Sequence, residues 1–477
     1  MNPDCLLNDV QLAGLRRRLQ SQLATAPAHA LLSVTLDLGR ERCDWLVGKL
    51  AQTHATWWAQ PASADYRLAL GRALIFTTAG PARFSALQSA FAGLAPGWLH
   101  DDSDATGAIP AAHIGFAFAE EERESREAPG ELPNARLVVP AILLQSRAGR
   151  CSATFSCVAH DGEEAFAGWL ETLRVARPEH EASAKAGVLH RLPAPLADRA
   201  FLARIRAALA DIAAGRLDKV VTTRSIHLAS TQPIALAPLL AVLARRHPTC
   251  TIYSIGHRGR SFVGATPERL VSLAGGQVRA DALAGTAWFC TAAETPPAAS
   301  LKLQDDKNSR EQQLVVDTVY AALAPLCASL EAPSSAQVMQ LRGLQHLHTR
   351  LSGRVHAGVG LFDLIARLHP TPAVGGAPTA AARRWLAAHG DQRGAWYTGG
   401  IGWIDRDGNG EIAVALRCAR IDGARAELFA GAGIVAGSDP AQELAETEVK
   451  LGPVIDALQH AVPLAAPRAT KTGTGTQ

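Results

Sequence analysis

Apolar residues recur at helical spacing in two segments of the C-terminal half, 306–322 and 440–458. Other segments are short, apolar and bounded by turn residues, which is typical of strands. These strand-like segments are 219–228, 251–255, 269–273 and 411–421. The mixture of helices and strands predicts a fold of the α+β class.

The first part of the chain shows the same kinds of pattern without any concentration of reactive side chains. Helical spacing is found over 12–23, and a strand-like apolar run over 137–145. A stretch rich in proline and alanine, 192–197, separates this part from a further helix. That helix has Phe201, Ile205, Leu209 and Ile212 on one face.

We therefore predict three parts along the chain. A scaffold portion over 1–190 completes the fold, and a portion over 200–460 carries the chemistry. A tail over 465–477 has few apolar side chains and is predicted to be disordered.

The composition is that of a globular protein, with 48% hydrophobic and 19% charged residues. The formal net charge of +3 is spread along the chain, which disfavours nucleic acid as a partner, because binding to a phosphate backbone needs a concentrated basic surface. No stretch approaches the ~20 apolar residues of a membrane span, and the N-terminus has no basic segment followed by an apolar run. Eight cysteines without a CxxC pair are expected to be reduced, packed thiols. These features predict a cytoplasmic protein that does not act at a membrane.

The second of the two predicted helices has a distinctive polar face. Asp439 is its expected N-cap, and Glu443, Glu446 and Lys450 follow at i, i+3 and i+7. Two carboxylates and one ammonium therefore share a face. Taken alone, this pattern is more typical of solvated ion pairs than of a binding site.

Two features upstream of this helix also admit two interpretations. Gly431 and Gly433 allow a ligand to approach the backbone closely, but a tight turn would use glycine as well. Arg417 alternates with alanines in the predicted strand 411–421, so its guanidinium has room to bind a carboxylate. An ordinary arginine on an edge strand fits this pattern slightly better.

Three further charged residues are candidates. Glu311 lies among apolar neighbours of the first predicted helix, and with Glu446 it would supply the hard oxygen ligands that Mg²⁺ prefers. Lys219 opens an apolar strand, and a desolvated amine can act as a general base. Glu268 follows a proline in a turn that would aim its carboxyl group into a cleft. A boundary glutamate that reaches solvent fits Glu311 equally well, and a surface charge at a strand end is the better interpretation of Lys219 and Glu268 without further context.

Taken in order, these segments resemble the chorismate-utilising enzyme family, which includes isochorismate, salicylate, anthranilate and aminodeoxychorismate synthases. The resemblance covers about residues 201–458. The segments that carry it are Asp218-Lys219-Val220-Val221, Gly264-Ala265-Thr266-Pro267-Glu268, Ala284-Gly285-Thr286, 307–316, Gln345-His346-Leu347, His369-Pro370-Thr371-Pro372-Ala373, Leu416-Arg417, Gly431-Ala432-Gly433-Ile434 and 446–451.

The resemblance implies a fold and an activity. The fold would be anthranilate/isochorismate synthase-like, with stacked β-sheets flanked by helices around a central cleft. The activity would be that of an isochorismate synthase, an isomerase that adds water at ring C2 of chorismate and removes the C4 hydroxyl group reversibly. It further implies Mg²⁺ as cofactor, chorismate as small-molecule substrate and a monomeric protein. The product would serve siderophore, salicylate or menaquinone biosynthesis.

The resemblance also assigns roles. Lys219 would be the base that activates water, and Glu268 the acid that protonates the departing hydroxyl. Glu311 and Glu446 would hold Mg²⁺, with Glu443 beside the metal. The remaining assigned residues would bind the substrate, and they are Ala284, Gly285, Thr286, His346, Ala373, Tyr397, Arg417, Gly431, Gly433 and Lys450.

Three positions bear on the subfamily. One class of aminodeoxychorismate synthases has a nucleophilic lysine where this chain has Ala284, and salicylate synthases typically have threonine at the position of Ala373. Both residues favour isochorismate synthase, whereas salicylate synthases share Tyr397. Salicylate synthase and the large subunit of anthranilate synthase remain the enzymatic alternatives.

Two departures from the family pattern lie before and after Glu311. Asn308 and Gln312 stand where the family usually has an acidic residue and a histidine. We therefore expect the metal affinity to differ from that of other family members. A catalytically silent chorismate-binding protein is the non-enzymatic alternative.

Overall fold

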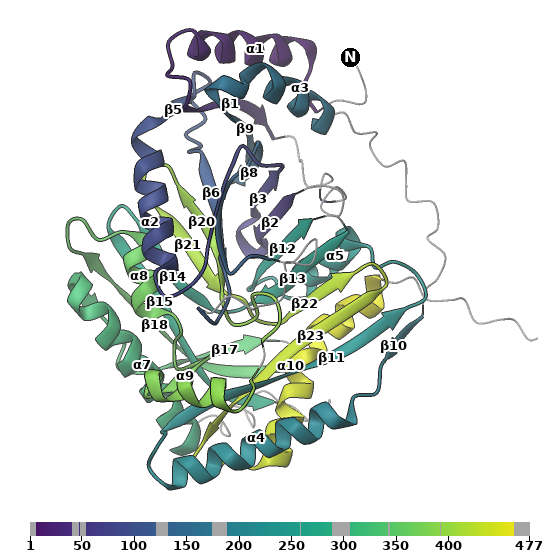
Figure 1. The fold of residues 1–477 in the computed structure, drawn as a ribbon, viewed down its shortest axis with the longest axis vertical. Coiled ribbons are helices and arrows are strands. Elements are labelled where there is room, and N and C mark those ends of the chain that lie inside the picture. Colours follow the sequence, from purple (N-terminus) through teal and green to yellow (C-terminus); the bar gives the residue numbers. More distant parts are fainter. Residues whose placement is uncertain are drawn as a thin grey trace, which may run out of the picture.

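Two large β-sheets form the body of the protein in this computed structural model (Figure 1). The structure describes residues 6–40, 47, 54–120, 132–173, 188–257, 259–288, 306–341, 344–391 and 393–461. The tail predicted at 465–477 lies outside these residues. Among the described residues, no helix combines the length and the apolar character that a membrane span requires.

The larger sheet has 13 strands. Its order, with β19 (Gly376–Ala377) paired beside β11, is β10 (Leu189–Arg191), β11 (Lys219–Ser230), β23 (Arg425–Val435), β22 (Cys418–Asp422), β13 (Arg260–Thr266), β12 (Thr251–His257), β2 (Ala55–Gln60), β3 (Asp65–Leu70), β8 (Ile142–Arg147), β9 (Arg150–Val158), β1 (Leu31–Gly39) and β5 (Trp98–Asp101).

The smaller sheet has 10 strands. Its order, with β17 (Gln337–Leu341) paired beside β18, is β16 (Cys327–Glu331), β18 (Leu344–Val355), β15 (Gln277–Trp288), β14 (Arg269–Ala274), β21 (Gly410–Val414), β20 (Gly400–Asp405), β6 (Ala111–Phe116), β7 (Ala135–Val139) and β4 (Leu74–Thr78). In each sheet, the strands from before residue 160 therefore lie together on one side and the strands from after residue 188 on the other.

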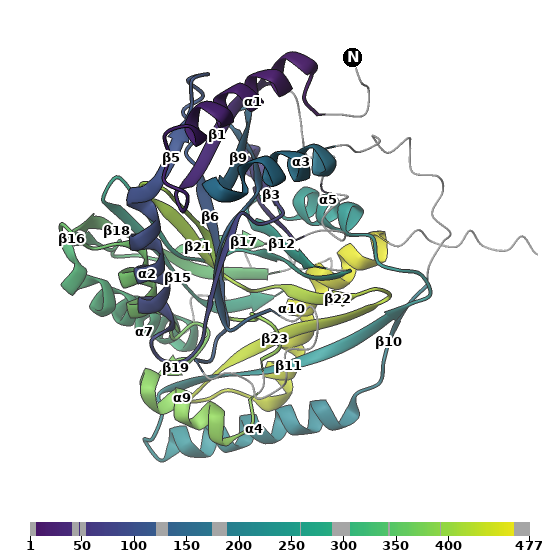
Figure 2. The same cartoon turned by 45° about the horizontal axis from the view of Figure 1, so that its top comes forward.

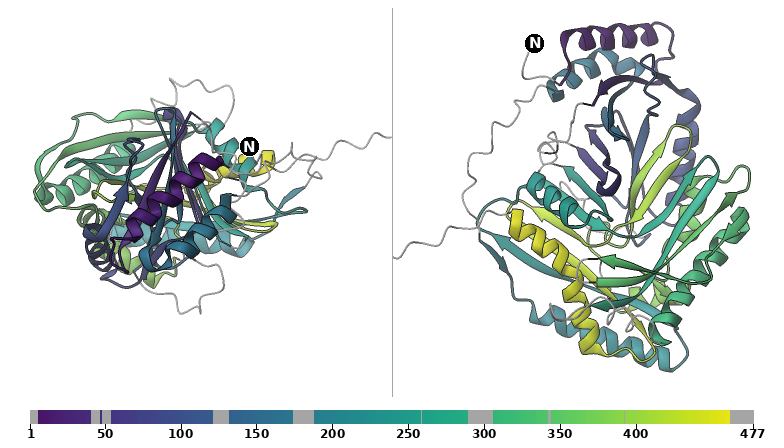
Figure 3. Two further views of the ribbon diagram at one scale, coloured as in Figure 1. Left: turned by 90° about the horizontal axis from the view of Figure 1, so that it is seen from above. Right: turned by 180° about the vertical axis from the view of Figure 1, so that it is seen from behind.

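Helices cover the outer faces of the sheets and bury their apolar stripes there. One group contacts the larger sheet and consists of α1 (Asp9–Leu23), α3 (Gly162–Leu173), α4 (Pro195–Ala213), α5 (Leu236–Arg246), α9 (Thr379–Ala388) and α10 (Pro440–Ala461). The other contacts the smaller sheet and consists of α2 (Arg83–Leu94), α7 (Asp306–Leu323) and α8 (Leu361–Leu368). The views from the front and from behind place α1 and α3 at one end of the molecule and α4 at the other (Figure 3).

The predicted α+β class is confirmed, and most predicted elements have boundaries close to the observed ones. The two helices predicted over 306–322 and 440–458 are α7 and α10. Asp439 is the N-cap of α10, because its Oδ1 accepts a hydrogen bond of 2.9 Å from the backbone N–H of Gln442. The five cysteines in the described residues are buried and unbridged, as predicted.

Two predicted strands are wrong because the chain changes sheets within them. The run 137–145 is divided at Pro140, which lacks a backbone donor, into β7 of the smaller sheet and β8 of the larger one. The run 411–421 is divided into β21 and β22, again in different sheets. Hydrophobic alternation continues through both breaks and therefore does not reveal them.

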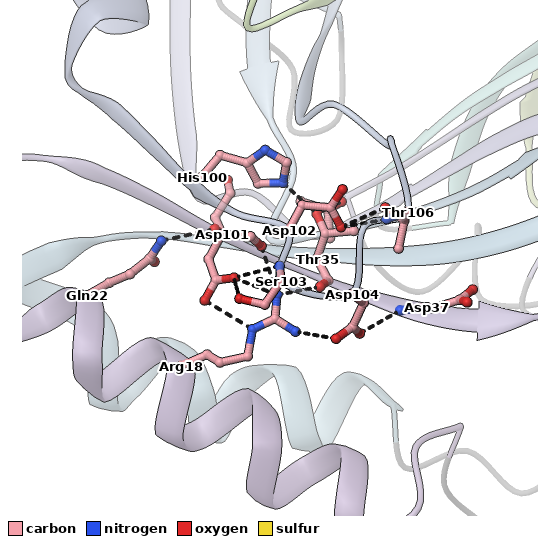
Figure 4. A network of polar contacts seen from close by, with 12 residues as sticks. Arg18, Gln22, Thr35, Asp37, His100, Asp101, Asp102, Ser103, Asp104 and Thr106 are labelled. Carbon is pink, nitrogen blue, oxygen red and sulfur yellow. Dashed lines mark hydrogen bonds and ion pairs between the residues drawn. The ribbon is translucent and has the colours of Figure 1, made fainter.

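Arg18 attaches helix α1 to the edge of the larger sheet, where α1 and α3 lie over β1 and β9 (Figure 2). Its guanidinium donates to both Asp101 carboxylate oxygens, at 3.0 and 2.8 Å, and to the Thr35 carbonyl at 2.8 Å. It also donates to Asp104, whose second oxygen accepts the Asp37 N–H (Figure 4). One partly buried arginine thus joins a helix, a strand and the loop after β5.

Replacing Arg18 with alanine is expected to lower the free energy of unfolding by about 1–3 kcal/mol, because several charge-assisted hydrogen bonds are lost. The neighbouring Arg17→Ala, which changes an exposed side chain of the same helix, is the control and should change stability by less than about 0.5 kcal/mol. Denaturant unfolding of both variants measures the difference, and equal effects would contradict the anchoring role of Arg18.

Candidate functional site

The described residues enclose a cavity of about 500 Å³ between the two sheets. Its walls come from β11 and β23 of the larger sheet, β15 and β18 of the smaller sheet, and helices α7 and α10. Every residue that the sequence analysis assigned to the site lines this cavity. A cavity of this size suits a small metabolite.

One wall is the antiparallel pair β11 and β23, in which Val221 faces Gly433 and Thr223 faces Gly431. The absence of a side chain at Gly433 leaves room for other groups: a Cβ there would lie 2.9 Å from Glu311 Oε1 and 3.1 Å from Lys219 Cε. The glycine therefore serves close approach in a regular strand rather than the tight turn that was the alternative.

Lys219 and Glu311 form an ion pair inside the cavity. The distance from Lys219 Nζ to Glu311 Oε1 is 2.7 Å, and the lysine side chain is only 1% exposed. The alternative of a lysine at the surface is therefore excluded. Lys219 begins β11 and Glu311 lies on α7, so this pair joins the larger sheet to the helix that covers the smaller one.

Glu446 and Lys450 form a second ion pair, one helical turn apart on α10, with an N–O distance of 2.5 Å. Lys450 Nζ also donates to the carbonyl oxygen of Gly431 at 3.0 Å. Both side chains are mostly buried, and Glu443, one turn earlier, is 3% exposed. The polar face of α10 thus lines the cavity instead of facing solvent.

The two cavity carboxylates have the character of ligands for a cation. Glu311 and Glu446 each hold a lysine ammonium group at hydrogen-bond distance, so positive charge already lies at both carboxylates. Hard carboxylate oxygens in a pocket that also admits a substrate match the preference of Mg²⁺, which uses few protein ligands. Among the described residues, no three His, Cys, Asp or Glu side chains form a metal-ligand group.

Glu268 and Arg417 lie on two adjacent connections between the sheets. The chain passes from β13 to β14 through Glu268, and from β21 to β22 through Arg417. Hydrogen bonds of 3.0 Å from Val414 N–H to the Glu268 carbonyl and 3.1 Å from Ala265 N–H to the Arg417 carbonyl hold the connections together. Both side chains line the cavity.

The backbone of Arg417 differs from the prediction. The alternating pattern placed Arg417 within a strand, but its φ of +48° is left-handed and it lies between β21 and β22. A left-handed backbone is strained for a residue with a side chain. The surrounding hydrogen bonds hold Arg417 in this conformation and direct its guanidinium into the cavity.

Glu268 is protonated near neutral pH. Burial and the negative charge of Asp281 together raise its pKa to about 8, against the opposing positive charges of Lys219, Arg417 and Lys450. A buried carboxyl group that keeps its proton can donate it to a reacting group.

His346 is neutral, and its hydrogen bonds determine which nitrogen carries the proton. Nδ1 is 3.1 Å from the carbonyl oxygen of Gly285, which can only accept, so Nδ1 carries the hydrogen. Nε2 then accepts from Arg417 Nη2, at 3.1 Å. Burial lowers the pKa of His346 well below its usual value, and the charges of Arg417 and Lys450 add to this effect.

The two departures from the family pattern have structural partners. Asn308 Oδ1 accepts the N–H of Thr286 at 3.1 Å and packs against Gly285, whose φ of +62° accompanies a bulge in β15. Gln312 Nε2 donates to the carbonyl of Ala282 and to Thr349 Oγ1, at 3.1 and 3.0 Å. Both amides therefore stabilise the cavity wall that carries Ala284, Gly285 and Thr286.

Asp281 on β15, which acts on Glu268, was not predicted from the sequence. Burial favours its neutral form, but a hydrogen bond and charge from His348, with further charge from Arg269, keep the pKa of Asp281 below its usual value. A single carboxylate in the apolar run that precedes Gly285 was the available signal, because an isolated buried charge needs partners.

Arg393, which holds three cavity-lining segments together, was not predicted from the sequence either. Its guanidinium donates to the carbonyls of Val374 and Val221, at 2.6 and 2.7 Å, and to Thr398 Oγ1 at 2.7 Å. Its Nε donates to Asp391 at 2.9 Å. No local pattern in the sequence distinguishes this arginine from those on the surface.

The sequence model of the chorismate binding enzyme family matches residues 18–459. Curated relatives include isochorismate synthase MenF of Bacillus subtilis, 38% identical over 54% of this chain and 55% of that protein. The salicylate biosynthesis isochorismate synthase of Pseudomonas aeruginosa is 36% identical, with shares of 54% and 55%. The chain thus spans about half the length of these relatives.

Solved structures with the same fold include the menaquinone-specific isochorismate synthase MenF of Escherichia coli, with a TM-score of 0.76 and 24% identity over 94% of this chain and 98% of that one. Anthranilate synthase component I of Streptococcus pneumoniae has a TM-score of 0.65 and 19% identity, over 82% and 92%. These structures confirm the predicted anthranilate/isochorismate synthase-like fold.

Proposed function

We propose that this chain, which belongs to the chorismate binding enzyme family, is an isochorismate synthase that converts chorismate to isochorismate reversibly with Mg²⁺. The observation that carries the proposal is that a buried lysine and a protonated buried glutamic acid line one cavity of metabolite size. The names of the relatives at 36–39% identity support the same activity.

Glu268 is the general acid. The C4 hydroxyl of chorismate is a poor leaving group unless it is protonated as it departs. Glu268 supplies this proton because burial and the charge of Asp281 keep its carboxyl group protonated near neutral pH. Lys219, Arg417 and Lys450 stabilise the carboxylate that remains after the transfer, since each favours the charged form.

Lys219 is the general base that removes a proton from water as the water attacks C2. Its almost complete burial places the amine out of bulk solvent. Nζ lies at hydrogen-bond distance from Glu311, and the absence of a side chain at Gly433 makes room for the Lys219 side chain. A base held at the cavity wall lowers the entropic cost of placing water at the ring.

Arg417, Lys450 and the Gly431/Gly433 backbone orient the two carboxylates of chorismate. Arg417 presents a planar donor group that suits the enolpyruvyl carboxylate, and Tyr397 lies beside Gly431 at the same end of the cavity. His346 accepts from Arg417 and so directs the guanidinium. These contacts bind the dianion before the proton transfers take place.

Mg²⁺ is the proposed cofactor, held by Glu311 and Glu446 with Glu443 beside them. When bound, it would neutralise a substrate carboxylate and polarise the ring site. The cation would also replace the lysine partners of both carboxylates, so Lys219 and Lys450 would become available for water and substrate.

Isochorismate synthase is favoured over salicylate synthase by Ala373, and over aminodeoxychorismate synthase by Ala284. Cytoplasmic location and a monomeric state remain predictions.

Incubation of the protein with chorismate and Mg²⁺ should yield isochorismate, identified by chromatography. Lys219→Ala and Glu268→Gln should each lower kcat at least about 100-fold without loss of the folded state, because each removes one proton transfer. Glu171→Gln on the exposed surface of α3 is the matched control and should leave the rate unchanged. Formation of salicylate and pyruvate would identify a salicylate synthase instead, and formation of anthranilate when ammonia is supplied would identify an anthranilate synthase. Binding of chorismate without turnover would indicate a catalytically silent protein.

The pH dependence of kcat/KM should show a fall in activity above about pH 8. The sign follows from the raised pKa of Glu268: the carboxyl group is an acid only while protonated, which holds below a pKa of about 8. Asp281→Asn should move this fall to lower pH, because it removes a negative charge that favours the protonated form. Asp317→Asn, an exposed change on α7, should leave the profile unchanged, and an unshifted profile in Asp281→Asn would contradict the role of Asp281.

Lys450→Met should tighten Mg²⁺ binding by about fivefold, measured by calorimetry without substrate, because Glu446 loses the ammonium group that competes with the cation. Arg384→Met, which removes an exposed charge on α9, should leave the affinity unchanged. Weaker binding in Lys450→Met would show that the metal does not take the place of this lysine.

A further inference from the structure

A second polar site lies between the two sheets, away from the large cavity. His113 is on β6, whose alternate residues Ile114 and Phe116 pack with helices on the outer face of the smaller sheet. His113 therefore points the other way, towards the larger sheet. It is 5% exposed, and neither ring nitrogen has a hydrogen-bond partner among the described residues. Such a group is unusual in a protein interior.

Arg136 is beside His113 on the neighbouring strand β7. The register pairs Gly115 with Arg136 and His113 with Val138. His113 and Gly115 are on the same face of β6, so Arg136 is the diagonal neighbour of His113 on that face. Its guanidinium lies 5.1 Å from the centre of the Trp396 ring. Among the described residues, nothing forms a hydrogen bond or an ion pair with the Arg136 guanidinium. Burial lowers the pKa of Arg136 to about 10, which still leaves it charged at neutral pH.

The charges around His113 are positive. Arg67 and Arg136 are the charged groups that act on it, and with burial they lower the pKa of His113 to about 3. A neutral imidazole donates one N–H. A partly buried guanidinium is less stable without a counter-charge, and a water molecule would satisfy its hydrogen bonds without neutralising the charge.

Two small cavities open beside these groups. One has a volume of about 20 Å³ and is lined by residues that include Thr56, Arg72, His113 and Arg136. The other, of about 10 Å³, shares Thr56, His113 and Arg136 and extends to Trp396. Neither shares a lining residue with the large cavity. A volume of this size holds one water-sized species and excludes a carboxylate metabolite.

We propose that this space binds a single halide-sized anion, chloride under ordinary conditions, held by the Arg136 guanidinium and a His113 N–H. The site joins the sheets, because His113 and Arg136 belong to the smaller sheet and Thr56 to the larger. The anion supplies the counter-charge that the described residues around Arg136 do not provide. Its role is structural, and it does not depend on the proposed enzymatic activity.

Thermal unfolding in sodium chloride and in sodium gluconate of equal ionic strength tests the proposal. The rise in Tm from gluconate to chloride should be about 2 °C larger in the wild type than in Arg136→Met, because only the wild type binds the anion. General salt effects on the protein surface are common to both proteins and cancel. Arg206→Met, the same substitution on the exposed surface of α4, should keep the wild-type response.

Crystals of the wild type grown with bromide give a second, independent measurement, which also decides the matter if Arg136→Met fails to fold. An anomalous peak between Arg136 and His113 is expected. The proposal is overturned by a water molecule without anomalous signal at this position, by a protein carboxylate on Arg136, or by equal salt responses in the wild type and Arg136→Met.

Discussion

Two neighbouring strands leave the larger sheet together and enter the smaller one, and the candidate site depends on this shared bend. The pair β13 and β22 continues as the pair β14 and β21, and backbone hydrogen bonds across the bend keep the two connections in contact. The bend separates the sheets enough to leave a cavity between them. It also places Glu268 and Arg417, which are far apart in sequence, beside each other at its wall.

Charge balance is the second constraint on the cavity. Lys219 and Lys450 would each be costly to bury alone, and each is paired with a carboxylate from a helix. Glu268 lacks such a pairing and is neutral instead, with Asp281 favouring that state. The cavity thus combines Lys450 and Arg417, whose charges suit binding of a dianion, with Glu268 and Lys219, which the proposed mechanism uses for proton transfer.

Local chemistry made part of this architecture predictable. The Asp439 cap, the spacing of Glu443, Glu446 and Lys450, and the glycines of β23 follow from short-range rules, and the order of the motifs indicated the family. The sheet exchanges at Pro140 and Arg417 were not predictable, because alternating hydrophobicity is the same on both sides of a bend. Asp281 and Arg393 act through contacts between distant segments, which no local pattern contains.

The two polar regions between the sheets differ in how they solve the same electrostatic problem. In the large cavity, carboxylates from α7 and α10 line the space between the sheets. Around His113, the walls are β-strands whose inward positions carry tryptophan, isoleucine and threonine. No described carboxylate contributes to the pKa of His113 or Arg136. In our proposal the counter-charge of Arg136 is therefore a diffusible anion, and the small volume beside Arg136 restricts it to a single small ion.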